Sequence, residues 1–191
     1  MEPAPELELD KRPGLPSDLH VLLLEHPRDA WQSARSPLAD FWVQKHAHIK
    51  RQSAALMQAN VEFREGRISA VRFGTAIAPP LQGFLGELHG HHQIEDFHYF
   101  PAFRRAEPRL DRGFDVLAAD HEQLHAGILA IVEAVNTFIA TIRDETAADT
   151  DAQKIAADAY ITASELMHRR LDRHLTDEED LIIPVMLAHG H

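Results

Sequence analysis

The stretch HHQIEDFHYFP, residues 91–101, has a counterpart in HLTDEEDLIIP, residues 174–184. In each stretch a glutamate, Glu95 or Glu178, follows a histidine by four residues, and a proline follows the glutamate by six. Four residues make about one turn of an α-helix, so each histidine–glutamate pair projects from one helix face. The repeat therefore predicts two helices that each present an imidazole and a carboxylate on the same side.

Four amphipathic helices can be placed around this repeat, because apolar residues recur at steps of three, four and seven. Ser36-Pro37 suits a helix start, since serine caps helices and proline is tolerated in the first turn. Pro79-Pro80 is taken as the start of the next helix, and no segment shows sustained strand alternation. These features predict an all-α, antiparallel, up-down-up-down four-helix bundle. The expected helices cover residues 37–65, 80–100, 112–144 and 152–183.

The segment that precedes the bundle has a different composition. Residues 1–16 are rich in proline and charge, and residues 17–26 form a short apolar stretch closed by Pro27. We therefore expect residues 1–35 to be an N-terminal extension, partly irregular with one short helix, and residues 36–191 to form the bundle.

Composition excludes several classes of protein. The net charge of −11 argues against a nucleic-acid surface. The absence of cysteine excludes disulfides and thiolate sites, so any metal must be held by nitrogen and oxygen. We find neither an apolar run near the roughly 20 residues of a membrane span nor a basic-then-apolar secretion signal. A cytoplasmic protein that binds neither membrane nor nucleic acid is expected.

The 14 histidines are the unusual feature of the composition. His121 and His125 lie one turn apart on a helix face that carries Leu117 and Ile128, so both are expected to point inward. At 100° per residue, His46 falls on the apolar face of its helix and His48 does not. Five other histidines are expected to be solvated: His89, His98, His168, His189 and His191. The candidate metal ligands are His46, His91, Glu95, His121, His125, His174 and Glu178.

The spacing of these residues also predicts that they lie at the same level along the axis of the bundle. Each helix places its first inward histidine nine or ten residues from a predicted end, which is about 14–15 Å from the same end of an antiparallel bundle. Five imidazoles and two carboxylates exceed the four ligands of a structural zinc. Two octahedral ions offer about twelve positions, and these ligands plus one bridging oxygen fill all but about one. The set therefore favours a dinuclear centre with room for a small ligand.

These residues resemble the hemerythrin family, in particular bacterial hemerythrin-like proteins with the HHE cation-binding domain. The resemblance covers residues 37–187 and rests on the two histidine–glutamate–proline stretches, on Asp120-His121, and on His46 followed by Ile49 and Lys50. It implies two non-haem iron ions with a bridging oxo or hydroxo group, which bind or react with O₂. A register one residue later, with His92 and Asp96 in place of His91 and Glu95, stays open.

The function expected from this resemblance is binding of dioxygen, nitric oxide or peroxide for sensing, carriage or storage. An alternative is a di-iron enzyme that turns over peroxide or nitric oxide, or that oxidises or stores iron. A third is a protein in which the metal only stabilises the fold. The oligomeric state stays open.

Overall fold

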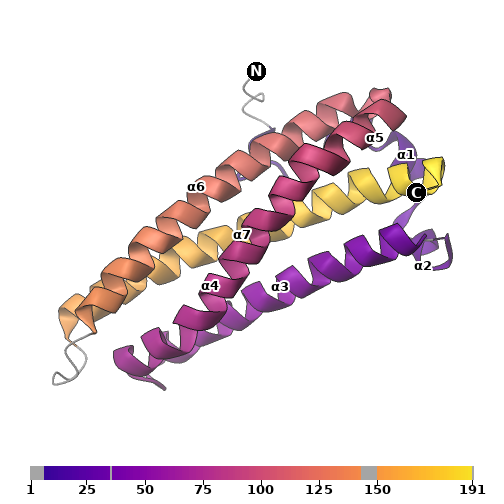
Figure 1. Cartoon of the computed structure of the whole chain (residues 1–191). Coiled ribbons are helices and arrows are strands. Elements are labelled where there is room, and N and C mark those ends of the chain that lie inside the picture. The colour runs from indigo at the N-terminus through magenta and orange to yellow at the C-terminus, as the bar shows by residue number, and fades with distance from the viewer. Residues whose placement is uncertain (1–6, 35, 143–149, 191) are drawn as a thin grey trace. The chain divides into compact units, whose positions relative to one another are not determined.

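The computed structural model describes residues 7–34, 36–142 and 150–190. Within these ranges the chain is helical and contains no strand, which confirms the all-α prediction (Figure 1). Predictions for residues 1–6, 143–149 and 191 lie outside the described residues. The long helices are α3 (Pro37–Arg64), α4 (Ala70–Ile94), α6 (Asp111–Thr141) and α7 (Asp151–His189).

Shorter elements precede and join the long helices. In the N-terminal segment they are η2 (Ser17–Leu19), α1 (Val21–Glu25), η3 (Arg28–Ala30) and α2 (Trp31–Ala34). After α4 the chain continues through a π-helical turn, η4 (Glu95–Tyr99), into α5 (Phe100–Ala106) and the 3₁₀ turn η5 (Pro108–Leu110). The short apolar helix expected within residues 17–26 is thus present as η2 and α1.

The chain divides into two compact units, and each contains a part of every long helix. Unit 1 comprises residues 1–48, 90–123 and 170–191, and unit 2 comprises residues 49–89 and 124–169. The chain leaves unit 1 along α3, returns along α4, leaves along α6 and returns along α7. This order is that of an up-down-up-down bundle.

Local signals fix the ends of α3. The N–H of Ala39 donates to Ser36 Oγ over 3.3 Å, so Ser36 is the expected cap. At the other end, Arg67 N–H donates to the Glu62 carbonyl and Gly66 N–H to the Phe63 carbonyl. These are the two hydrogen bonds of a Schellman motif, and Gly66 has the positive φ of 68° that the motif requires.

The start of α4 differs from the prediction. The helix begins at Ala70, after Ser69, whose Oγ accepts a hydrogen bond from Arg72 N–H over 3.4 Å. Pro79 and Pro80 lie inside the helix and face solvent, so they do not open it as expected. A proline in a helix interior costs about 3 kcal/mol, and burial of the apolar side chains on the opposite face offsets that cost.

Pro101 and Pro184 do not stop their helices either. Pro101 follows the wide turn η4, and the helix resumes at once as α5. Pro184 lies within α7, which continues to His189. A π turn leaves a carbonyl without its usual partner four residues on, which suits a following proline that has no N–H to donate.

Each unit has its own apolar core. In unit 1 the core joins side chains of the N-terminal segment to those of the long helices, including Leu15, Leu22, Trp42, Phe103, Phe114 and Ile183. In unit 2 Phe73 lies at the centre, with its ring centroid 4.7 Å from Phe63, 5.6 Å from Phe138 and 5.9 Å from Tyr160.

One helix among the described residues is long and apolar enough to cross a membrane. It spans Pro108–Thr141, with a mean hydropathy of 1.5 over its most apolar window, so the expectation that no such run exists was wrong. The core helix of a soluble bundle meets the same criterion. The helix also carries Asp120 and His121, both buried within unit 1.

Candidate metal centre

Seven buried or nearly buried side chains converge inside unit 1 as two groups of possible metal ligands. In each group one nitrogen or oxygen atom per residue lies within 4.8 Å of the others. One group joins residues of α3, α4, η4 and α7, and the other joins residues of α4, α6 and α7. The groups are His46, His91, Glu95 and Glu178, and His92, His121 and His174.

The atoms that face one another in these groups have no hydrogen-bond partner. This holds for Nε2 of all five imidazoles, for both oxygens of Glu95 and for Oε2 of Glu178. A buried polar atom left unpaired costs about 1–3 kcal/mol, so eight of them together are not tolerated in a simple core. Imidazole nitrogen and carboxylate oxygen are ligands of divalent metal ions, and cations bound among these atoms would satisfy them.

The two carboxylates lie between the two groups. Glu95 places Oε1 2.9 Å from His91 Nε2 and Oε2 3.5 Å from His121 Nε2. Glu178 places its unpaired Oε2 3.5 Å from His46 Nε2 and 3.4 Å from His174 Nε2. Each glutamate therefore reaches one imidazole of each group.

Three of the imidazoles contact a further carboxylate through Nδ1, the ring nitrogen that is not part of the ligand group. The Nδ1 atoms of His46, His121 and His174 lie 3.2, 2.8 and 3.2 Å from oxygens of Glu179, Asp96 and Asp120, respectively. An ionised carboxylate can only accept, so Nδ1 carries the proton, and in the neutral imidazole Nε2 keeps the lone pair that a metal needs. Carboxylates in this position orient metal-binding histidines and raise their basicity.

A family model, described as Hemerythrin HHE cation binding domain, matches residues 38–186. The chain belongs to this family. No curated protein and no solved structure matches the chain significantly. The match confirms the resemblance drawn from the sequence, and it makes the chain a helical protein that binds metal cations.

The electrostatics of the HHE domain suit cation binding. Burial lowers the pKa of His91 to about 3 and that of His92 well below its usual value. Burial, followed by the nearby charge of Glu178, raises the pKa of Glu95. Burial opposes ionisation of His174, but the nearby carboxylates of Asp120 and Glu178 outweigh it and raise the pKa of His174 to about 9. A cation that enters here displaces protons, so its binding weakens as pH falls.

His125, one of the predicted ligands, lies outside both groups. Its side chain is exposed in unit 2, with its ring centroid 5.3 Å from that of His89. Eight residues after Leu117, His125 is rotated by about 80° from the centre of the apolar stripe. His121, four residues after Leu117, is rotated by about half as much and stays buried.

His92 takes the fifth imidazole position. The sequence left His91 and His92 as alternatives in two registers, but the structure uses both, one in each group. Asp96, the partner of His92 in the second register, instead accepts the hydrogen bond of His121 Nδ1. The number of ligands, five imidazoles and two carboxylates, is unchanged.

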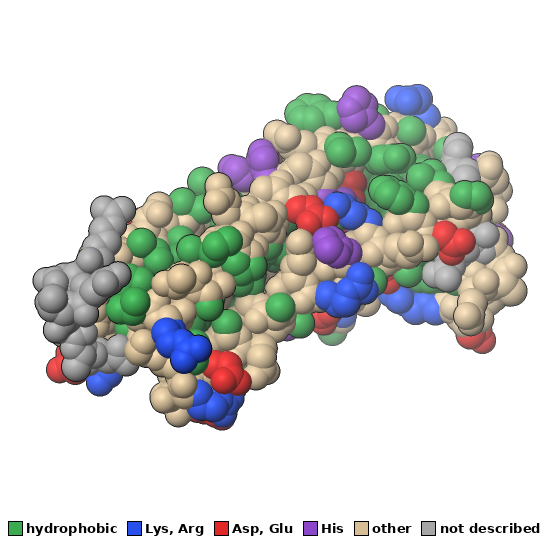
Figure 2. All heavy atoms as spheres, turned by 60° about the horizontal axis from the view of Figure 1, so that its bottom comes forward, with side chains coloured by type: hydrophobic (Ala, Val, Ile, Leu, Met, Phe, Trp, Pro, Cys, Tyr) green, Lys and Arg blue, Asp and Glu red, His purple; other side chains and the backbone are tan. Residues whose placement is uncertain are grey.

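The other six predicted ligands come close together in unit 1. The structure brings together His46, His91, Glu95, His121, His174 and Glu178. The histidines expected at the surface behave less uniformly: His48, His89 and His98 are exposed, whereas His168 is half-buried, with Nδ1 2.8 Å from Ser53 Oγ. Figure 2 shows imidazoles at the molecular surface.

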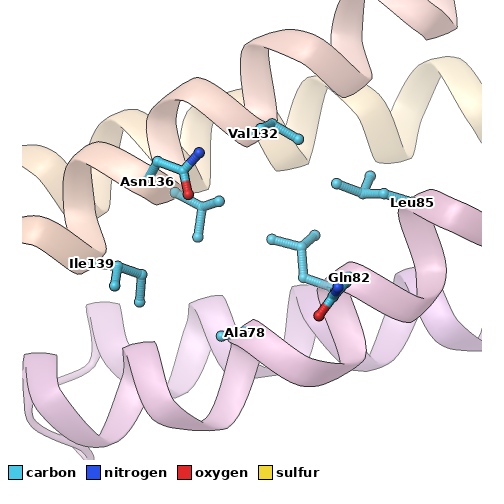
Figure 3. A pocket seen from close by; sticks show the side chains of 8 residues that line it. Ala78, Gln82, Leu85, Val132, Asn136 and Ile139 are labelled. Carbon is cyan, nitrogen blue, oxygen red and sulfur yellow. The ribbon is translucent and has the colours of Figure 1, made fainter.

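A cavity in unit 2 offers no comparable chemistry. It has a volume of about 440 Å³ and lies between α4 and α6 (Figure 3). Its lining is aliphatic apart from the amides of Gln82 and Asn136, and it contains no titratable side chain. The lining offers no ligand for a metal ion and no acid–base pair, so the cluster in unit 1 is the stronger candidate site of the two.

Proposed function

We propose that the chain is a non-haem di-iron protein that binds dioxygen, nitric oxide or peroxide for sensing, carriage or storage. The observation that supports the proposal is the unequal division of imidazoles between two groups, with Glu95 and Glu178 each close to an imidazole of both. His92, His121 and His174 would hold one iron with few positions to spare. His46 and His91 would hold the other, which supports an open position on that side.

A pair of irons with a bridging oxo or hydroxo group would supply reversible redox chemistry and that open position to a small ligand. The residues around it determine what can enter. Trp42 lies against both imidazoles of the smaller group, with ring centroids 6.1 Å from His46 and 6.3 Å from His91. Tyr99 and Phe103 pack on Trp42, at 4.7 and 6.0 Å. This aromatic cover excludes bulk water and supports a ligand of very few atoms.

Trp42 also fixes one of the shared carboxylates. Its indole N–H donates to Glu178 Oε1 over 3.0 Å, and both side chains are buried. The bond leaves Oε2 directed at the imidazoles. It also commits the indole proton, so Trp42 is a poor donor to an incoming ligand. Binding without turnover is thereby favoured over chemistry that consumes protons.

The test is the absorption spectrum of iron-loaded protein under argon, then under O₂, then again under argon, repeated with nitric oxide. The proposal expects a spectral change that reverses when the gas is removed and leaves no product. A two-iron protein whose spectrum responds to neither gas nor peroxide would contradict it.

The enzymatic alternative depends on a proton donor. Tyr99 is the candidate, because its half-buried ring lies against Trp42. Peroxide or nitric oxide consumed over many cycles by the wild type, and slowed at least tenfold in Tyr99→Phe, would favour the enzyme. Equal and negligible turnover in both proteins supports binding alone.

A further inference from the structure

The N-terminal segment lies before the residues that match the family, yet it is built into unit 1. The matched region begins at residue 38, whereas the described segment covers residues 7–34. Leu7, Leu15, Leu19, Leu22 and Trp31 are at most 6% exposed and belong to the same apolar core as Trp42 and Phe103. The segment therefore folds with the part of the chain that carries the candidate metal centre.

Arg12 of this segment contacts the carboxylate that is hydrogen-bonded to His174, a member of the three-imidazole group. Its guanidinium is buried, and both terminal nitrogens donate to Asp120, with Nη1 2.7 Å from Oδ1. Its Nε donates to Asp177 Oδ2 over 2.8 Å. Asp120 Oδ2 in turn accepts the hydrogen bond of His174 Nδ1. Arg12, Asp120 and His174 thus form a continuous chain that ends at a candidate ligand of the three-imidazole group.

Arg28 of the same segment reaches the back of the other group. Its Nη1 lies 3.4 Å from Glu179 Oε2, and its Nε donates to Asp180 Oδ1 over 2.7 Å. Glu179 Oε1 lies 3.2 Å from His46 Nδ1. His46 belongs to the two-imidazole group. Each ligand group therefore has one chain of arginine, carboxylate and histidine that starts in the N-terminal segment.

The two chains differ in strength. The Arg12 and Asp120 side chains are each 1% exposed, whereas the Arg28 side chain is 44% exposed. Arg12 meets Asp120 through a two-point fork, which fixes the carboxylate in one orientation. Arg28 contacts Glu179 at one point, over 3.4 Å, and the Arg28 side chain is partly exposed to solvent. It therefore holds the Glu179 carboxylate less firmly. The third such carboxylate, Asp96, has no arginine partner among the residues that the structure describes.

We propose that the N-terminal segment is a working part of the metal centre, in which Arg12 and Arg28 are positioning residues for His174 and His46. Arg12 acts through Asp120, and Arg28 acts through Glu179. The inference rests on the proposed metal centre and goes beyond it, because it assigns a role to a segment outside the family match. Loss of a carboxylate behind a metal-bound histidine typically lowers metal affinity 10–100-fold, so an arginine that holds the carboxylate should matter somewhat less.

The first experiment measures the rate at which iron-loaded protein loses metal to an excess of chelator. We expect about a tenfold faster release from Arg12→Met, and about two- to threefold from Arg28→Met. Arg170→Met is the matched control. Arg170 pairs with Asp10 of the same segment, with Nε 2.8 Å from Oδ1, and among the described residues it has no hydrogen bond to Asp96, Asp120 or Glu179. Release from Arg170→Met should stay within about twofold of the wild type.

A double-mutant cycle separates positioning from loss of structure. If Arg12 acts through Asp120, the double variant Arg12→Met/Asp120→Asn releases metal no faster than Asp120→Asn alone. Multiplying effects would overturn the inference, as would a rate for Arg12→Met equal to that of the wild type or of Arg170→Met. Because Arg12→Met removes the guanidinium that Asp120 and Asp177 share, Arg12→Lys is measured beside it. Lysine keeps the charge but not the fork, so an intermediate rate is expected.

A second readout needs no metal, so it distinguishes failure of this inference from failure of the proposed function. In ¹⁵N-histidine NMR of the metal-free protein, the Nδ1–H signal of His174 is assigned by its loss in Asp120→Asn. Arg12→Met should shift or broaden that signal, and Arg170→Met should leave it in place. If the wild type binds no metal, the proposed function fails, and an unmoved signal in Arg12→Met overturns the positioning role on its own.

Discussion

His91 and His92 are adjacent in the chain, yet their imidazoles belong to different ligand groups. Their ring centroids lie 5.8 Å apart, and both Nε2 atoms are buried without a hydrogen-bond partner. Consecutive residues on a helix are rotated by about 100°, so α4 can present one ring to each group. Glu95 follows one turn later and offers an unpaired oxygen to an imidazole of each group. A single helix thereby fixes the spacing between the two groups.

The first prediction compares His92, which belongs to one of the two groups, with His125, which belongs to neither. His92→Ala should lower bound metal well below that of the wild type, because it removes one of three imidazoles from its group. His125→Ala should leave metal content unchanged, since that side chain is exposed and outside both groups. Elemental analysis of the purified variants measures both. Equal losses in the two variants would contradict the ligand assignment.

Trp42→Phe should keep the metal but change its environment. The substitution removes the hydrogen bond to Glu178 Oε1, and a bond to a charged group contributes about 1.5–3 kcal/mol. We expect a shifted absorption spectrum and a lower free energy of unfolding in urea. Trp31→Phe is the comparison, because it also removes an indole N–H, but one that donates to the His26 carbonyl and not to a candidate ligand, and phenylalanine keeps the aromatic face that lies under Arg28. Its stability should fall without a spectral shift, and identical spectra for all three proteins would count against the role of Trp42.

The pair formed by Glu107 and Arg109 should make stability depend on pH. Hydrogen bonds from Arg109, at 2.6 and 2.7 Å, lower the pKa of Glu107 from 4.5 to about 2. Because the folded-state pKa lies below the unfolded one, the pair stabilises the fold above pH 4.5, and this contribution is lost as pH falls towards 2.

Glu107→Gln tests this pair in metal-free protein. Arg109 is largely exposed, so screening limits the loss of unfolding free energy at neutral pH to about 1 kcal/mol. The difference from the wild type, measured by urea unfolding, should shrink between pH 4.5 and 2. A difference that is the same at every pH would show that the carboxylate charge is not responsible.

Two glycines should respond to alanine in opposite ways. A Cβ at Gly113 would lie 2.8 Å from Cδ1 of the buried Leu181, so Gly113→Ala should destabilise unit 1 by about 1–3 kcal/mol. A Cβ at Gly83 meets nothing within 4 Å, so Gly83→Ala should stabilise α4 by about 0.5–1 kcal/mol. Urea unfolding gives both signs, and destabilisation at Gly83 would contradict the open surface there.

Much of the fold could be predicted from local chemistry. The bounds of α3 lie within a residue of the predicted range 37–65, because the cap at Ser36 and the positive φ at Gly66 depend on a few neighbouring residues. The start of α4 could not be predicted in this way. Pro79 and Pro80 are helix breakers by themselves, and only the packing of residues such as Phe73 and Ile77 makes their place inside the helix tolerable.

The candidate site, like the fold, could be predicted from the local sequence only in part. The histidine–glutamate repeat predicted most of the converging residues, since four-residue spacing fixes a helix face. His125 was misplaced because a ring about 80° from the centre of a stripe can fall on either side of its edge. Arg12 and Arg28 carry no local signal, because their contacts with Asp120 and Glu179 span 108 and 151 residues of sequence. Such contacts exist only once the chain has folded.

The most direct test is the metal content of freshly purified protein by elemental analysis, with its absorption spectrum in air. We predict about two irons per chain and the near-ultraviolet bands of an oxo-bridged ferric pair. One zinc per chain, or no metal after anaerobic loading with iron, would contradict the assignment of a dinuclear iron centre.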